Sequence, residues 1–282
     1  MTKLIITADD YGMSPAVNEG IEAGVAAGVI KSTNLMPGMA YCIGISKLKK
    51  KYPHLSVGLH WHLTAGYPVC QKNKILSLID DDGKFWCYSE FIKRFRKKLI
   101  SLDEIRIELI AQYQRFCDYY GGLPDYWNTH HNLLVGFNLF NLFLEVASSL
   151  NIKKMRNRQR IYVPAKGKTS KSIAWVLTEP AKRAILNKWT SKAKRKGFSS
   201  PDGIIVPLNE EDKLDLEYVF KHINWKQGMV GEMVIHPATS IDSEYFGAIT
   251  EKRIKEFLLF SDQAVIKLAE KNGIEVCGFE GV

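Results

Sequence analysis

Residues 4–15 spell LIITADDYGMSP and join a buried strand to two adjacent acids. The apolar and β-branched run 4–8 predicts a strand in the protein interior, and Ser14 with the proline after it predicts the start of a helix. Between strand and helix lie Asp9 and Asp10, whose charges repel each other and are costly to remove from water. A nearby cation would offset that cost, so the stretch predicts a cation at the end of the first strand.

Strand and helix patterns alternate along the rest of the chain. Further strands are expected at 31–38, 55–63, 125–130, 152–158, 228–238 and 274–281. Helices are expected at 40–51, 89–99, 101–121, 137–150 and 250–272. Repeated β/α units predict one α/β domain over residues 1–282 with a parallel sheet or barrel. A basic helical insertion of weak periodicity is expected at about 165–200.

Composition limits the function classes. The chain has 282 residues, 46% hydrophobic and 24% charged, which is typical of a globular protein. Its net charge of +9 is concentrated in runs 93–98 and 182–197. These runs resemble solvated helix faces, and no base-reading motif accompanies them, so no nucleic-acid partner is expected. No membrane span or leader is evident, and five dispersed cysteines without a CxxC pair indicate reduced thiols and a cytoplasmic protein.

Histidines gather at the ends of the expected strands. Five of the seven lie there: His60, His62, His130, His131 and His236. The carboxyl ends of parallel strands meet on one face of a β/α fold, where these imidazoles would join the acidic pair. One carboxylate and two imidazoles commonly bind Zn²⁺, Fe²⁺, Co²⁺ or Mn²⁺ and leave open positions for water and substrate. The pattern therefore predicts a metal site, with one Asp binding the cation and the other acting as a base.

Side-chain alternation separates the neighbouring histidines. Within a strand, His60 and His62 would point to the same face, whereas His130 and His131 would point to opposite faces. Only one of the latter two can then face the site. We expect His131 to pack against a helix or to lie at the rim.

Five motifs resemble those of one known family. They are TADDYGMSPAVNEGI, STNLMPGM, VGLHWHLTAGYP, THHN and GEMVIHPA, and their order and spacing resemble the YdjC-like carbohydrate deacetylases, which include the chitooligosaccharide deacetylases. The resemblance runs from residue 4 nearly to the C-terminus and is weakest over 160–200. It implies a distorted (β/α) barrel of the polysaccharide-deacetylase kind. It also implies removal of acetyl groups from N-acetylated sugars or oligosaccharides with one divalent metal ion, Mg²⁺ or Zn²⁺, and a homodimer.

The resemblance also implies roles for single residues. Asp10, His60 and His130 match the metal ligands. Asp9 matches the general base, and His236 matches the group that protonates the leaving amine.

Five further residues are expected to contact the substrate. They are His62, Tyr67, Trp127, His131 and Arg156. The rings of Tyr67 and Trp127 could stack on sugars. Arg156 could hold either Asp9 or a substrate oxygen.

The third motif departs from the family pattern. The family usually has D-x-H-x-H-x-H, whereas here Asn128, Asn132 and Leu134 replace the Asp and the later histidines. The expected ligand His130 survives, but residues that would orient it or line the sugar site do not. One alternative is therefore a sugar-binding or regulatory protein with a decayed site. Another is a different metal-dependent barrel amidohydrolase, in which His62 would also be a ligand.

Overall fold

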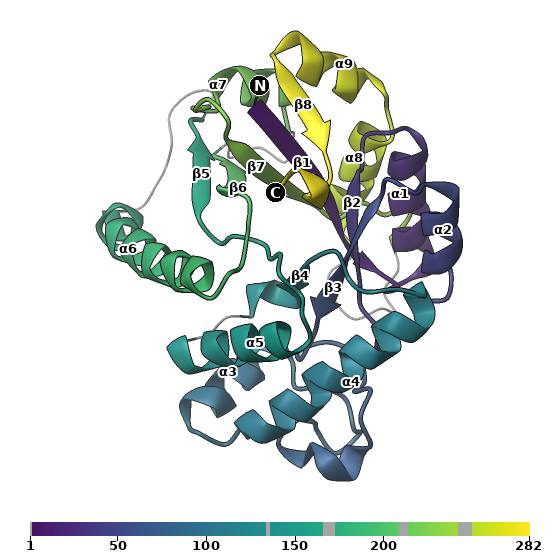
Figure 1. Cartoon of the computed structure of the whole chain (residues 1–282), viewed down its shortest axis with the longest axis vertical. Coiled ribbons are helices and arrows are strands. Elements are labelled where there is room, and N and C mark those ends of the chain that lie inside the picture. The colour runs from purple at the N-terminus through teal and green to yellow at the C-terminus, as the bar shows by residue number, and fades with distance from the viewer. Residues whose placement is uncertain (1, 134–135, 166–172, 209–213, 242–249) are drawn as a thin grey trace.

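The parallel sheet forms the centre of the molecule (Figure 1). The computed structural model describes residues 2–133, 136–165, 173–208, 214–241 and 250–282. Within these ranges the strands are β1 (Thr2–Tyr11), β2 (Ser32–Leu35), β3 (Ser56–Trp61), β4 (Trp127–Thr129), β5 (Arg160–Val163), β6 (Gly203–Pro207), β7 (Val230–Ile235) and β8 (Ile274–Cys277). They follow the order β4-β3-β2-β1-β7-β6-β5, and β8 pairs with β1 outside this path.

Every pairing between these strands is parallel, and the two ends of the sheet stay apart. Between β4 and β5, the described residues make only isolated bridges, Trp127 with Met155 and Lys154 with Ser199. The sheet is therefore an incomplete barrel, which confirms the expected distorted (β/α) barrel.

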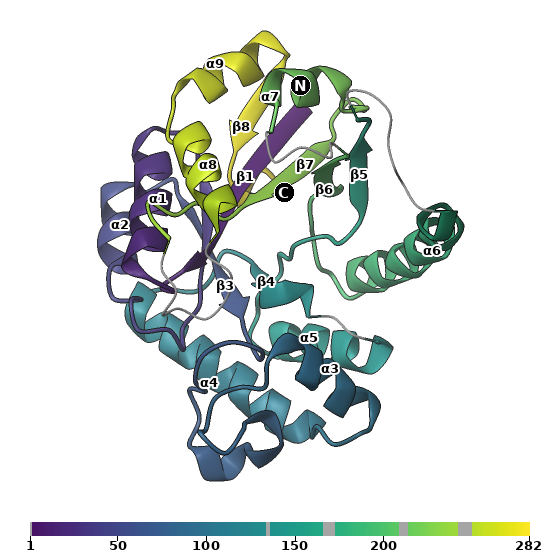
Figure 2. The same cartoon turned by 180° about the vertical axis from the view of Figure 1, so that it is seen from behind.

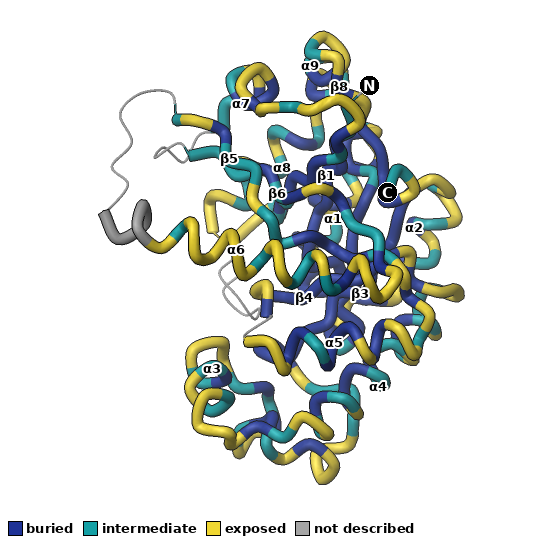
Figure 3. Tube along the Cα trace, turned by 60° about the vertical axis from the view of Figure 1, so that its left-hand side comes forward, coloured by how far each residue is buried: buried dark blue, intermediate teal, exposed yellow. Residues whose placement is uncertain are grey.

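Helices cover the outside of the sheet (Figures 1 and 2). They are α1 (Pro15–Ala26), α2 (Ile45–Lys51), α3 (Tyr88–Arg96), α4 (Leu102–Tyr120), α5 (Phe137–Ser149), α6 (Ile173–Arg195), α7 (Leu216–His222), α8 (Glu251–Phe260) and α9 (Ala264–Lys271). Helix α1 contacts β1 and α8, while α4 contacts β3 and α5. Helix α6 extends beside β5 and its described side chains are largely exposed (Figure 3). Among the described residues, no helix combines the length and apolarity that a membrane crossing requires.

The expected elements differ from the observed ones in three places. The segment 152–158 is not a strand, and the strand of this region, β5, begins only at Arg160. Strand β6 and helix α7 were not expected, because both are short and follow segments without clear periodicity. The helix expected over 250–272 is two helices, α8 and α9, since the Asp262 carboxylate accepts the Ala264 N–H at 2.8 Å and starts a new helix. Part of the expected basic insertion, 166–172, lies outside the described residues, and the remainder contains α6.

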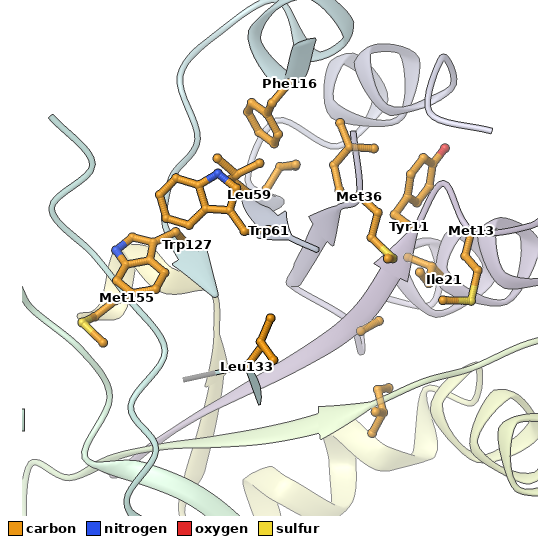
Figure 4. Packing of buried hydrophobic residues seen from close by; sticks show 14 of the residues in the cluster. Tyr11, Met13, Ile21, Met36, Leu59, Trp61, Phe116, Trp127, Leu133 and Met155 are labelled. Atoms are coloured by element: carbon orange, nitrogen blue, oxygen red, sulfur yellow. The ribbon is translucent and has the colours of Figure 1, made fainter. Parts of the chain in front are cut away.

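Aromatic side chains fill the space between the sheet and α4–α5. Figure 4 shows the indoles of Trp61 and Trp127 next to each other, with ring centroids 5.3 Å apart. Both pack against Phe143, and Trp61 Nε1 donates to the Leu109 carbonyl at 3.0 Å. This packing places the core directly beneath the ends of β3 and β4, so it fixes the backbone from which His60 and His130 project.

A second close contact lies on β3, where Gly58 meets the ring of Tyr126. The ring stacks on Phe279 with centroids 3.6 Å apart, and its hydroxyl donates to the Thr33 carbonyl and accepts from Ser32 Oγ, each at 2.9 Å. A Cβ atom at Gly58 would lie 2.5 Å from this ring. The Tyr126 ring is fixed by its stacking on Phe279 and by the two hydrogen bonds of its hydroxyl, so it cannot move away from a Cβ atom at Gly58.

We predict that Gly58→Ala lowers the free energy of unfolding by about 1–3 kcal/mol, the usual cost of overpacking a core. Chemical denaturation of purified protein measures the change. Gly122→Ala is the matched control, because its Cβ would meet only ring carbons of Tyr120 at 3.5 and 3.6 Å. An equal loss in both variants would contradict the predicted clash.

Candidate active site

The ends of four strands bring the predicted site residues together. His60 Nε2 at the end of β3 lies 3.3 Å from Asp10 Oδ1, and His130 Nδ1 after β4 lies 3.0 Å from the same oxygen. His236 follows β7, and its Nε2 atom lies 3.9 Å from Asp9 Oδ2. The five residues therefore lie at the carboxyl edge of the parallel sheet, as the strand-end rule predicts.

A β-bulge lets the neighbouring acids Asp9 and Asp10 face the same site. In a regular strand they would point to opposite faces. The register of β1 against β2 shifts between Ala8 and Tyr11, and Asp10 adopts a left-handed backbone conformation with φ of 76°. Such a bulge redirects side chains, and the Asp10 N–H is held by Asn34 Oδ1 at 3.2 Å.

Asp10, His60 and His130 form a donor set that suits a metal ion. All three are buried, and one potential ligand atom from each lies within 4.8 Å of the others. Metal–ligand bonds of about 2.0–2.2 Å place neighbouring ligand atoms ~3.0–3.5 Å apart, which matches the spacing of Asp10 Oδ1 from the two imidazoles. Within the described part of the chain, the buried His130 Nε2 has no hydrogen-bond partner. The three residues could therefore hold a divalent cation.

Asp9 is held by a buried arginine that also binds a second acid. Arg156 Nη1 and Nη2 donate to the two carboxylate oxygens of Asp9, each at 2.7 Å, and its Nε donates to Glu232 Oε1 at 2.9 Å. Asn34 Nδ2 also donates to Asp9 Oδ1. Burial alone would raise the pKa of Asp9, but the charge and hydrogen bonds of Arg156, together with the charges of His60 and His236, outweigh it and lower this pKa to about 2. Asp9 is therefore ionised throughout the neutral range.

A second arginine, Arg253 of α8, binds the carboxylate of Asp10. Its Nη2 donates to Asp10 Oδ2 at 2.8 Å, so one carboxylate oxygen faces the arginine and the other faces the histidines. Burial favours the neutral acid, but His130, His60 and Arg253 together keep the pKa of Asp10 well below its ordinary value. Within the described ranges, Arg253 Nη1 is buried without a partner.

The sequence analysis missed three residues of this site. Asn34 and Arg253 carried no signal of their own, because one is a polar residue within the short strand β2 and the other resembles any basic residue on an amphipathic helix. Glu232 did carry one, since it is a single charge inside the apolar strand β7.

Two of the five residues expected to contact substrate lie at the surface. Tyr67 follows β3 and is 45% exposed. His131 is exposed in a short 3₁₀ turn with φ of 56°, its Nδ1 is 2.9 Å from Thr64 Oγ1, and its ring centroid is 3.9 Å from that of His130. His131 thus lies at the rim of the group, as expected. Substrate contact by either residue stays a prediction.

The other three are buried, and substrate contact by any of them stays a prediction. Trp127 packs in the core between Trp61 and Phe143. His62 is fully buried, and burial lowers its pKa to about 3. Arg156 is buried and holds Asp9, the first of its two expected roles, and contact with a substrate oxygen stays a prediction.

Of the altered motif positions, two are described. Asn128 is buried and its side-chain amide lies 2.5 Å from His60 Nδ1, whereas Asn132 is exposed. Leu134 lies outside the described residues.

The YdjC-like protein family matches residues 3–271. The chain belongs to this family. Carbohydrate deacetylase of Clostridium beijerinckii is 34% identical over 150 residues, 53% of this chain and 58% of that protein. Chitooligosaccharide deacetylase of Proteus mirabilis is 37% identical over 147 residues, 51% of this chain and 54% of that protein. The alignments thus span little more than half the length of these curated relatives.

Structural similarity of this YdjC-like chain extends further than sequence similarity. A solved structure from Enterococcus faecalis, named as a candidate for cellobiose-phosphate cleavage, is 26% identical with a TM-score of 0.77. The match covers 99% of this chain and 98% of that one. The whole fold, including the part beyond the curated alignments, is therefore shared.

We predict that Arg156→Met destabilises the protein by about 3–5 kcal/mol at pH 7, because it leaves Asp9 and Glu232 buried without a cation. The loss should shrink towards pH 4. In the native protein the pKa of Asp9 lies below its ordinary 3.8, so its stabilising contribution is full above about pH 4 and is lost as pH falls towards 2. In the variant both acids would be destabilising when ionised and would gain protons as pH falls.

Denaturant unfolding at pH 7 and at pH 4 measures both effects. Arg106→Met is the matched control, since that arginine pairs with Glu145 at an exposed position. Equal losses from Arg156→Met at both pH values would show that the two acids are not the source of the effect.

Proposed function

We propose that this protein is a metal-dependent deacetylase that removes acetyl groups from N-acetylated sugars or oligosaccharides of the chitooligosaccharide kind. The observation that carries the proposal is the convergence of the Asp10–His60–His130 donor set with Asp9 and His236 at one edge of the sheet. Membership of the YdjC-like family and the names of the Clostridium and Proteus relatives support it. Mg²⁺ and Zn²⁺ are the proposed metals, and the homodimer and the cytoplasmic location stay predictions.

The metal and the side chains divide the chemistry of amide hydrolysis. A divalent cation held by Asp10, His60 and His130 would supply a more acidic water and polarise the acetyl carbonyl. The remaining steps are proton transfers, and these fall to Asp9 and His236.

Asp9 is the proposed acceptor of the proton from the attacking water. Its low pKa keeps it ionised, so the acceptor form is always present. The same low pKa makes Asp9 a weak base, and Arg156 limits the directions from which a proton can reach it. An acid limb of the activity profile above about pH 4 would therefore come from another group.

His236 is the proposed donor to the leaving nitrogen. Its side chain is 41% exposed and lies beside the Asp9 carboxylate, so it can contact both substrate and the acid pair. Desolvation lowers the pKa of His236, and Asp10 and Asp9 oppose that change. The protonated form is thus lost at a lower pH than in an ordinary imidazole, and an alkaline limb of activity should follow that loss.

The direct test is incubation of the purified chain with a panel of N-acetylated oligosaccharides, with products analysed by mass spectrometry. We expect loss of acetyl groups that a chelator abolishes and Zn²⁺ or Mg²⁺ restores. His130→Ala should lose the metal, whereas Asp9→Asn should keep it and turn over ~10²–10⁴-fold more slowly. Products unaffected by chelation would exclude a metal-dependent reaction. Absence of products from metal-loaded protein would instead favour the binding protein with a decayed site.

We predict that His236→Ala impairs amide hydrolysis far more than ester hydrolysis. An amine leaves only when protonated, whereas a phenolate leaves with less need of a proton. The comparison of an N-acetyl sugar with an aryl acetate, across pH, measures this difference, and the alkaline limb for the amide should flatten. Equal damage to both substrates would point to binding rather than proton donation.

A further inference from the structure

Asn128 on β4 lies between His60 on one side and Asn34 and Arg156 on the other. One atom of its side-chain amide is 2.5 Å from His60 Nδ1, and the opposite atom is 2.9 Å from both Asn34 Nδ2 and Arg156 Nη1. The residue is 3% exposed, so water cannot replace a missing partner. In the metal-free site both sides are satisfied when the amide NH₂ faces His60 Nδ1 and the amide oxygen faces Asn34 and Arg156.

The His60 side needs the oxygen whenever a metal is bound. The imidazole presents Nε2 to the Asp10 oxygen and thus to the proposed metal position. A neutral imidazole that ligates through Nε2 carries its proton on Nδ1. That N–H has the Asn128 side chain as its partner, so it requires the amide oxygen there.

The opposite side also favours the amide oxygen, although Asn34 Nδ2 and Arg156 already donate to Asp9. Asn34 Nδ2 and the Arg156 guanidinium offer only N–H groups, and an amide NH₂ facing them sets donors against donors. Turning the amide satisfies them but presents its NH₂ to His60 Nδ1, which must then be unprotonated. The His60 proton moves to Nε2, where it can be donated to Asp10 Oδ1. In that arrangement the metal-ligating nitrogen is blocked by its own proton.

From this conflict we infer that Asn128 is a positioning residue that couples the tautomer of His60 to metal binding and so weakens the affinity for a divalent cation. The inference rests on the proposed metal site. Metal entry requires the amide to turn and the ring proton to change nitrogen, which leaves Arg156 and Asn34 facing an NH₂. A carboxylate of the same shape would accept from both sides at once and remove the conflict.

The test is Asn128→Asp, with Zn²⁺ as the probe in competition with a chromophoric chelator. We expect affinity to rise about 10–100-fold, the range over which partners of ligating histidines act. Asn132→Asp adds the same charge two residues after His130, at an exposed position without contact to His60, and should change affinity only slightly. An equal gain in both variants would overturn the inference, because charge alone would explain it.

Nuclear magnetic resonance of the His60 ring gives a readout independent of affinity. In metal-free native protein the proton should reside on Nε2, and in Asn128→Asp it should reside on Nδ1. A native ring already protonated on Nδ1 would overturn the inference. Equal Zn²⁺ affinity of the native protein and of Asn128→Asp would also overturn the inference. That result would leave the proposed metal site intact. Absence of Zn²⁺ binding from every variant would overturn the metal site and this inference together.

Discussion

Buried negative charge at the end of β1 is the constraint on which the rest of the site depends. Asp9 and Asp10 are removed from water, and each is stable only with cations or N–H donors around it. Arg156 meets this need for Asp9 while its own backbone N–H donates to the Trp127 carbonyl at 3.1 Å. The arginine thereby joins the edge strand β4 to the central strands β1 and β7. Such a buried pair adds little stability over apolar packing, but it fixes one arrangement of three strands.

The fold class and the gathering of acids and histidines at one edge of the sheet could be predicted from the sequence because their signals are local or periodic. Strand ends follow from apolar runs that stop at polar residues, and the rule for parallel sheets then brings His60, His130 and His236 to one edge. The features that could not be predicted from the sequence depend on tertiary contacts. The bulge at Asp10 breaks the alternation on which face assignments rely, and the burial of Trp127 depends on helices packing from elsewhere in the chain. The resemblance to a known family supplied roles but could not reveal that Arg253 contacts Asp10.

The shared structure extends beyond the shared sequence. Identity with the curated relatives covers about half of the chain, whereas the Enterococcus structure matches nearly all of it. A parallel sheet requires only apolar strands and amphipathic helices of suitable length, so its outer parts tolerate substitution. Helix α6 lies where sequence resemblance is weakest; most of its described side chains are exposed, and it joins the core through Trp189 and Ala193.

The left-handed backbone at Asp10 narrows the side chains that can occupy this position. Apart from glycine, asparagine and aspartate adopt such a conformation most readily, because their short polar side chains can bond to the nearby backbone. Of these residues only aspartate carries a negative charge. The backbone therefore restricts which acid can stand here: glutamate offers the same carboxylate but suits the conformation less well. An evolutionary route that replaced Asp10, the proposed metal ligand, would have to rebuild the end of β1 as well.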